Sequence, residues 1–198
     1  MSRTEFSFNL ALGMSILSWA FLGLNTANQL RPIPIQAMVS ALNLCVGTLI
    51  LRRRRVETNG SVYACAASFP ALFVGGWALS MTTLEWPVPA QVLFLGGGGL
   101  AIVSFVYLGR SFAILPAYRG TVTGGPFRVI RHPAYLGELL MISGCCLAAP
   151  GWASCWPLLI SLPLVAFRIS AEERVLAANS AYCDYSRKVR WRLVPRVW

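Results

Sequence analysis

Five long stretches without a charged side chain dominate this sequence and constrain its fold more than any other feature. They span residues 6–30, 32–51, 58–84, 86–109 and 139–167. A helix needs about 20 apolar residues to cross the roughly 30 Å hydrocarbon core of a bilayer. The first four stretches therefore each predict one transmembrane helix, at about 7–25, 33–51, 62–81 and 89–108. Only 12% of the residues are charged, about half the share in a soluble domain, so we expect an all-α, polytopic integral membrane protein.

The fifth stretch predicts a helical hairpin, because Pro150 and Gly151 form a strong turn signal at its middle. Its first arm, from about residue 134 to 149, would rise about 24 Å and nearly cross the membrane. Trp152 and Trp156 flank the turn, as aromatic side chains often do at the membrane interface. A hairpin returns the chain to the face it left. The segments 131–137 and 167–174 are therefore expected to lie close together.

The basic residues predict the orientation of the chain in the membrane. Seventeen Lys and Arg residues against seven Asp and Glu residues give a formal charge of +10, and such an excess is typical of cytoplasmic loops. If Arg52–Arg55 are cytoplasmic, helix alternation places the N-terminus and everything from Arg110 onward on that side, and only Arg31 opposite. This explains the charge without a nucleic-acid partner, and none is expected. The arginine run is either this anchor or a site for anionic lipids.

The cysteines argue against a metal site and against a disulfide framework. All six lie outside any C-x-x-C pattern, and His132 is the only histidine, whereas zinc sites combine several closely spaced ligands. We expect no metal and interpret the cysteines as reduced, small residues between packed helices.

Four consecutive glycines, Gly96–Gly99, lie inside the fourth predicted span. In water each would cost a helix about 0.8–1 kcal/mol relative to alanine. In a bilayer, small residues allow two helices to approach closely. The run predicts a packing groove for a neighbouring helix, with a channel for a lipid tail as the alternative.

The segment "RHPAYLGELL", residues 131–140, begins the hairpin. Pro133 suits the first turn of a helix and leaves the N–H groups of Ala134, Tyr135 and Leu136 available to an anionic group. His132 is either such a site residue or an ordinary hydrogen-bonded histidine.

Charged residues also mark the end of the hairpin. Arg168 and Glu172 are four residues apart and share a helix face, where they form either an ordinary ion pair or a functional one. Glu173 and Arg174 are expected to face solvent or to pair with nearby cytoplasmic charges. The link between residues 108 and 130 is rich in glycine and proline and long for a plain connection, which favours a binding loop over a flexible link.

Three motifs in the C-terminal half resemble the isoprenylcysteine carboxyl methyltransferase family and its bacterial relatives, which share ancestry with phospholipid N-methyltransferases. They are "VTGGPFRVIRHPAYLG" at 122–137, "RISAEE" at 168–173 and "YCDYSRKVRWRLVP" at 182–195. They occur in the family's order across segment 108–196. The resemblance divides the chain into four transmembrane helices, residues 1–108, and a catalytic region, residues 109–198. The latter comprises a cofactor-binding loop, the hairpin and a cytoplasmic C-terminal helix.

The resemblance implies methyl transfer from S-adenosyl-L-methionine at the cytoplasmic face of a membrane, which we expect to be the bacterial inner membrane. Arg168 matches the family's substrate-side arginine, and with His132 it forms the expected catalytic pair. The residues expected to contact the cofactor are Arg119, Gly120, Thr121, Val122, Phe127, His132, Pro133, Ala134, Tyr135 and Glu172.

The methyl acceptor is less sharply defined by the sequence. The favoured candidate for the methyl acceptor is a carboxylate on a prenylcysteine or similar lipid-like molecule. It is already ionised near neutral pH and needs no general base. A lipid amine, a thiol or an isoprenoid is the alternative, and an amine would need His132 or Glu173 as base. A non-catalytic membrane protein that retains the pocket is the remaining possibility.

Overall fold

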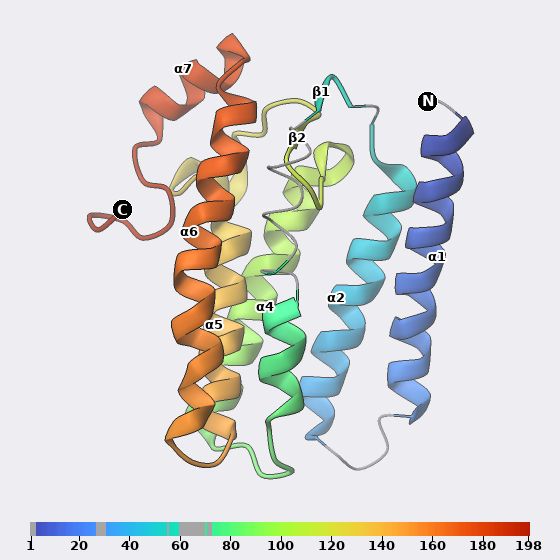
Figure 1. The fold of residues 1–198 in the computed structure, drawn as a ribbon, viewed down its shortest axis with the longest axis vertical. Helices are drawn as coiled ribbons and strands as arrows, with labels where there is room; N and C mark the ends of the chain where they lie inside the picture. Colours follow the sequence, from blue (N-terminus) through green and yellow to red (C-terminus); the bar gives the residue numbers. More distant parts are fainter. Residues whose placement is uncertain (1–2, 27–30, 55, 60–69, 71–72) are drawn as a thin grey trace.

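Long helices standing side by side make up most of the computed structural model of this chain (Figure 1). It describes residues 3–26, 31–54, 56–59, 70 and 73–198. The long helices are α1 (Arg3–Thr26), α2 (Ile33–Arg52), α4 (Val88–Leu108), α5 (Pro133–Ala148) and α6 (Trp156–Leu176), followed by the short α7 (Ser180–Lys188). The all-α prediction is confirmed.

The predicted membrane spans agree with the observed helices wherever these are described. Within the described residues, three segments are long and apolar enough to cross a membrane: Ile33–Arg52, Val88–Ser111 and Trp152–Leu176. Helix α1 covers the predicted span 7–25. The span predicted at 62–81 lies partly outside the described residues, although residues 73–80 are helical.

Proline in the first turn marks the start of several helices. Helices α2, α4, α5 and α6 all carry proline at the first or second position, where the missing N–H has no intrahelical partner to lose. The predicted start of the hairpin at Pro133 is therefore confirmed.

The hairpin itself is observed as predicted. Helix α5 ends at Ala148, the chain turns through Pro150 and Gly151, and a 3-10 helix at Trp152–Cys155 leads into α6. Gly151 has a φ of 76°, which is unfavourable for residues with a side chain. Figure 1 shows this turn at the end of the bundle opposite to α7, so α5 and α6 are antiparallel neighbours.

Glycines bring α4 and α5 into close contact. A Cβ atom on Gly97 would lie 2.5 Å from the Gly137 backbone oxygen, and one on Gly144 would lie 2.7 Å from the Ala90 oxygen. A Cβ on Gly98 would collide with Met38 of α2, whereas Gly96 and Gly99 have no neighbour within 4 Å. The packing groove predicted from the glycine run is thus formed by its two central members.

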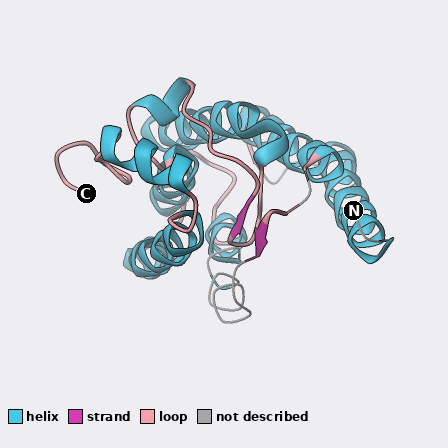
Figure 2. Ribbon diagram, turned by 90° about the horizontal axis from the view of Figure 1, so that it is seen from above, coloured by secondary structure: helices cyan, strands magenta, loops and turns pink. Residues whose placement is uncertain are grey.

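The loop before α5 is held by a strand pair that the sequence did not predict. Strand β1 (Thr58–Asn59) pairs antiparallel with β2 (Ala117–Tyr118), with Thr58 opposite Tyr118. The Arg54 N–H donates to the Arg110 oxygen at 2.7 Å nearby. Figure 2 shows the pair over the middle of the helix bundle. The loop is therefore anchored to the chain that leaves α2.

The C-terminal tail packs against the start of α5. The backbone N–H groups of Arg131 and His132 donate to the oxygens of Trp191 and Arg192 at 2.9 and 2.8 Å. The tail then turns back so that the Trp198 oxygen accepts from residues 192–194. The start of α1, the end of α2 and α7 lie toward the same end of the molecule, and the C-terminal tail lies beside α6 in that half (Figure 1).

Candidate functional site

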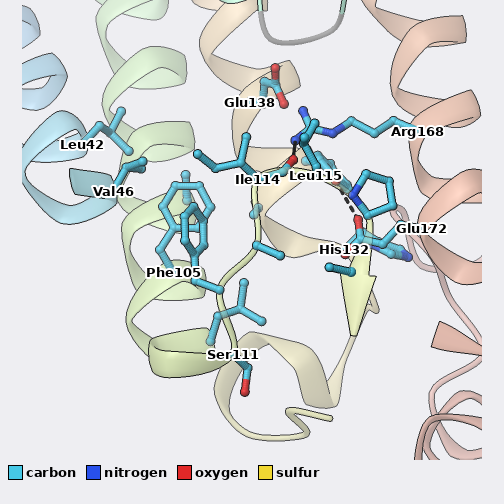
Figure 3. Close-up of a pocket in the computed structure, with 18 of the residues that line it drawn as sticks. Leu42, Val46, Phe105, Ser111, Ile114, Leu115, His132, Glu138, Arg168 and Glu172 are labelled. Atoms are coloured by element: carbon cyan, nitrogen blue, oxygen red, sulfur yellow. Dashed lines mark hydrogen bonds between the residues drawn. The ribbon is translucent and has the colours of Figure 1, made fainter. Parts of the chain in front are cut away.

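A cavity of about 1170 Å³ opens between the helices and reaches the loop before α5. Apolar residues of α2 and α4, among them Leu42, Val46 and Phe105, line one part of it (Figure 3). Polar and charged residues of α5 and α6 line another part. The cavity therefore combines an apolar compartment with a polar one, a combination suited to an amphiphilic ligand.

Nearly all the site residues predicted from the sequence line this one cavity. Pro133 is the exception, because it is fully buried in the first turn of α5. The predicted residues that line the cavity are Arg119, Gly120, Thr121, Val122, Phe127, His132, Ala134, Tyr135, Arg168 and Glu172. The chain brings them together from the loop and from both arms of the hairpin.

Tyr135 lies between the two charged groups that the sequence places on one face of α6. Its hydroxyl donates to Glu172 Oε2 at 2.7 Å, and the Arg168 guanidinium lies 4.9 Å from the centre of its ring. Arg168 Nη2 also donates to the Ile114 oxygen at 2.8 Å. Arg168 and Glu172, both among the described residues, form no salt bridge with each other. The ordinary ion pair that the sequence offered as one alternative is therefore absent. Tyr135 fixes both instead.

His132 is held from several directions. Its Nε2 lies 3.1 Å from Glu173 Oε1, its ring stacks on Tyr135 with centroids 5.6 Å apart, and its side chain is 5% exposed. The backbone of the tail holds its N–H group. His132 is therefore hydrogen-bonded, as one of the two sequence interpretations predicts, and it also lines the cavity.

Glu173 is the centre of a buried ionic cluster. Its Oε1 accepts from Arg131 Nη1 at 2.7 Å and its Oε2 from Arg192 Nε at 2.8 Å. The Tyr182 hydroxyl donates to Oε1 at 3.3 Å. Of the two predicted alternatives, the structure shows pairing with nearby charges, and the side chain is buried rather than in solvent. Glu173 thus joins the hairpin entrance, α6, α7 and the tail.

Two tyrosines of α7 complete the wall nearest the tail. Tyr182 and Tyr185 are buried and line the cavity, and the Tyr185 hydroxyl donates to the Phe127 oxygen at 2.8 Å. Burial raises the pKa of Tyr185 to about 12. Burial, with the negative charge of Glu173, raises the pKa of Tyr182 further. Both phenols therefore remain neutral hydrogen-bond donors. The closing sequence motif contained both residues but did not reveal this role.

The loop contacts the cavity with a fixed backbone. Arg119 is buried and donates to the Arg54 oxygen, and its own oxygen accepts from Ser111 Oγ at 3.1 Å. Gly120 has a φ of 110°, which only glycine adopts readily. The Tyr118 hydroxyl lies 3.3 Å from Thr121 Oγ1. These contacts fit the predicted binding loop better than a flexible link.

Sequence reasoning missed Glu138, a further carboxylate in the cavity wall. It lies on α5 three residues after Tyr135, and its charge acts on Arg168. The available signal was an acidic residue on the same helix face as Tyr135, directly before the last charge-free stretch. Across the described ranges, no group of three or more His, Cys, Asp or Glu side chains could hold a metal ion.

Comparison with known protein families gives one match to this region. Residues 88–181 match the family model described as phospholipid methyltransferase. A search of curated proteins found no match. The matched segment runs from the start of α4 into α7 and contains most of the cavity's polar residues. It covers the first two of the three motifs, confirms the resemblance and supports a membrane methyltransferase.

Proposed function

From the phospholipid methyltransferase domain at residues 88–181, we propose that the chain transfers a methyl group from S-adenosyl-L-methionine to a carboxylate on a prenylcysteine or similar lipid-like acceptor. One observation carries this proposal. The polar residues of the hairpin and the apolar residues of α2 and α4 line the same cavity. A water-soluble methyl donor and a lipophilic acceptor can therefore meet there.

The residues around Glu172 suit the methyl donor. The Tyr135 hydroxyl holds Glu172 Oε2, and no hydrogen bond from the described residues reaches Glu172 Oε1, which leaves it for a ribose hydroxyl. The first turn of α5 offers the N–H groups of Ala134 and Tyr135 to the donor's carboxylate. The rings of Phe127 and Tyr135 offer apolar and cation–π contacts to the adenine and the sulfonium.

Arg168 is suited to hold the acceptor carboxylate. It is 6% exposed, lines the cavity and is fixed by Ile114 and Tyr135. A charge-assisted pair with its guanidinium would orient the acceptor. The acceptor oxygen would form the new C–O bond while the bond from the methyl carbon to sulfur breaks, and the electron pair would stay on sulfur. Alignment and exclusion of water would supply most of the acceleration.

The engaged state of the two bases expected from the sequence supports a carboxylate over an amine. An amine acceptor must lose a proton, and the two expected bases were His132 and Glu173. These two groups bind each other, and Glu173 also binds Arg131 and Arg192. A carboxylate needs no proton removed, so the engaged state of both groups is compatible with its methylation.

The basic residues support an inside location for the site. The start of α1, the end of α2, α7 and the loop lie toward one end of the molecule, and the positive-inside rule assigns the arginine-rich end to the cytoplasm. We propose an integral protein of the bacterial inner membrane with its N-terminus and catalytic region cytoplasmic. Membrane lipids and the lipophilic acceptor are its expected partners.

Methyl transfer by the reconstituted protein tests this function. Labelled S-adenosyl-L-methionine and S-farnesylcysteine should give a base-labile methyl ester. Arg168→Gln should lower kcat/KM by at least about 100-fold, as expected when one partner of a buried charge pair is lost, and Arg168→Lys should restore only part of it. Glu85→Gln, at an exposed position near the opposite end, is the matched control. An unchanged kcat/KM for ester formation by Arg168→Gln would contradict the assignment.

A further inference from the structure

Glu138 lies deeper in the cavity than the residues assigned to the methyl donor. It follows Tyr135 by three residues on α5, which corresponds to about 4.5 Å along the helix axis. Figure 3 shows the Arg168 side chain reaching from α6 toward the Glu138 carboxyl group, with Glu172 and His132 on the other side of Arg168. Glu138 therefore faces the compartment that continues into the apolar walls.

The Glu138 carboxylate has no hydrogen bond and no salt bridge to any side chain or backbone group of the described residues. A carboxylate inside a membrane helix is costly unless it is paired or has a function. Glu173 illustrates the structural case, because it is paired with two arginines, a histidine and a tyrosine. Glu138 has only the nearby charge of Arg168. Its free oxygens border the cavity, where a ligand group can reach them.

Arg168, which lines the cavity, likewise retains hydrogen-bonding capacity. Its Nη2 is used by the Ile114 oxygen, but its buried Nε has no partner in the described part of the chain. A cation and an anion thus lie side by side at the acceptor end. A ligand that carried only a carboxylate would satisfy Arg168 and be repelled by Glu138. A head group with a carboxylate next to an N–H donor would satisfy both.

We propose that Glu138 is a specificity-determining residue that binds the N–H group beside the acceptor carboxylate. The acceptor is then an S-alkylated cysteine or a similar lipidated α-amino acid, and not a simple lipid or isoprenoid acid. This inference rests on the proposed function. It adds a second contact to the acceptor's head group: Arg168 binds the carboxylate and Glu138 binds the neighbouring N–H group. An α-ammonium group gives Glu138 a charge pair, and an α-amide gives it one hydrogen bond.

Three acceptors that differ only at the α-nitrogen test the inference. They are S-farnesylcysteine with its ammonium group, N-acetyl-S-farnesylcysteine with an amide N–H, and S-farnesylthiopropionic acid with no nitrogen. Wild type should methylate the two nitrogen-containing acceptors at least about tenfold more efficiently than the third, because an unmet buried polar group costs 1–3 kcal/mol. Glu138→Ala should remove that preference, mainly by raising the methylation of S-farnesylthiopropionic acid, because this acceptor then no longer faces an unpaired carboxylate.

Glu138→Gln distinguishes charge from hydrogen bonding. It keeps an amide oxygen as acceptor, so it should retain more activity toward N-acetyl-S-farnesylcysteine than toward S-farnesylcysteine. Donor affinity, measured by titration of both variants, should equal that of wild type and shows that they are folded.

Several outcomes would overturn the inference. An equal loss for all three acceptors would mean that Glu138 acts through the fold or through Arg168. A product methylated on nitrogen, or wild type that binds the donor but methylates none of the three, would also contradict it. Methylation of S-farnesylthiopropionic acid as efficient as that of the others would remove Glu138 from acceptor recognition while the proposed function stands. Loss of donor binding by wild type would instead contradict the proposed function itself.

Discussion

The Tyr135 hydroxyl donates a 2.7 Å hydrogen bond to Glu172 Oε2, so a residue from the first arm of the hairpin fixes a carboxylate from the second. The same ring carries the Arg168 guanidinium on its face. Tyr135 thereby separates the residue assigned to the donor from the residue assigned to the acceptor, and each can bind its own ligand.

Removal of the Tyr135 hydroxyl is predicted to weaken donor binding. A hydrogen bond to a charged group contributes about 1.5–3 kcal/mol, which corresponds to about a 10- to 100-fold loss of affinity. Tyr135→Phe should show a loss of this size for S-adenosyl-L-methionine in a calorimetric titration of the folded variant, together with a lower Tm, because the same hydrogen bond joins the two arms of the hairpin. Tyr107→Phe, at a half-exposed tyrosine of α4, should bind normally. Normal binding by Tyr135→Phe would remove this hydrogen bond from the donor site.

The glycine contact between α4 and α5 is predicted to be required for folding. Gly97→Leu places side-chain atoms where the Gly137 oxygen and Leu140 lie within 3 Å, so the helices must separate and lose packing. We expect a lower yield of folded protein and a markedly lower Tm. Gly96→Leu changes a neighbouring glycine with open space around it and should be tolerated. Equal behaviour of the two variants would contradict the observed packing.

Glu173 is predicted to hold the C-terminal tail on the hairpin. Glu173→Gln leaves Arg131 and Arg192 without their shared carboxylate, and breaking a buried ionic cluster from one side typically costs about 3–5 kcal/mol. Hydrogen exchange of residues 189–198 should become faster, and Tm should fall. Asp184→Asn removes a carboxylate whose pair with Arg187 is exposed, and it should change neither quantity. Unchanged exchange in Glu173→Gln would show that the tail is held by other contacts.

The raised pKa of Tyr185 predicts a loss of stability at alkaline pH. Its pKa is about 12 in the folded protein and about 10 when unfolded. Between these values the unfolded chain loses a proton that the folded one keeps, so the free energy of unfolding falls as pH rises. The stabilising contribution is complete below pH 10. Thermal unfolding of wild type and Tyr185→Phe should show the difference between them shrinking from about pH 10 to about pH 12. A pH-independent difference would contradict the shifted pKa.

The helices and the hairpin could be predicted from the sequence because they follow from local signals. Long charge-free stretches define membrane helices, Pro133 marks a helix start, and Pro150 with Gly151 marks the turn. A hairpin also brings the start of its first arm close to the end of its second arm. The sequence therefore predicted that the segment with His132 lies near the segment with Glu173.

Contacts that depend on three-dimensional packing could not be predicted in the same way. The strand pair of β1 and β2 has two residues on each side, too few for a periodic pattern. Spacing of four residues suggested a pair between Arg168 and Glu172, but Tyr135 from the other arm lies between them. The sequence patterns assign no role to Glu138, and only the structure places it in the cavity wall.

The central claim is that the polar part of this cavity binds the methyl donor, and one calorimetric titration tests it most directly. The purified protein in detergent is titrated with S-adenosyl-L-methionine and with S-adenosylhomocysteine, alongside Glu172→Ala and the exposed control Glu85→Ala. We predict micromolar binding of both compounds to wild type and to Glu85→Ala, and none to a folded Glu172→Ala. No binding to wild type, or unchanged affinity in Glu172→Ala, would contradict the claim.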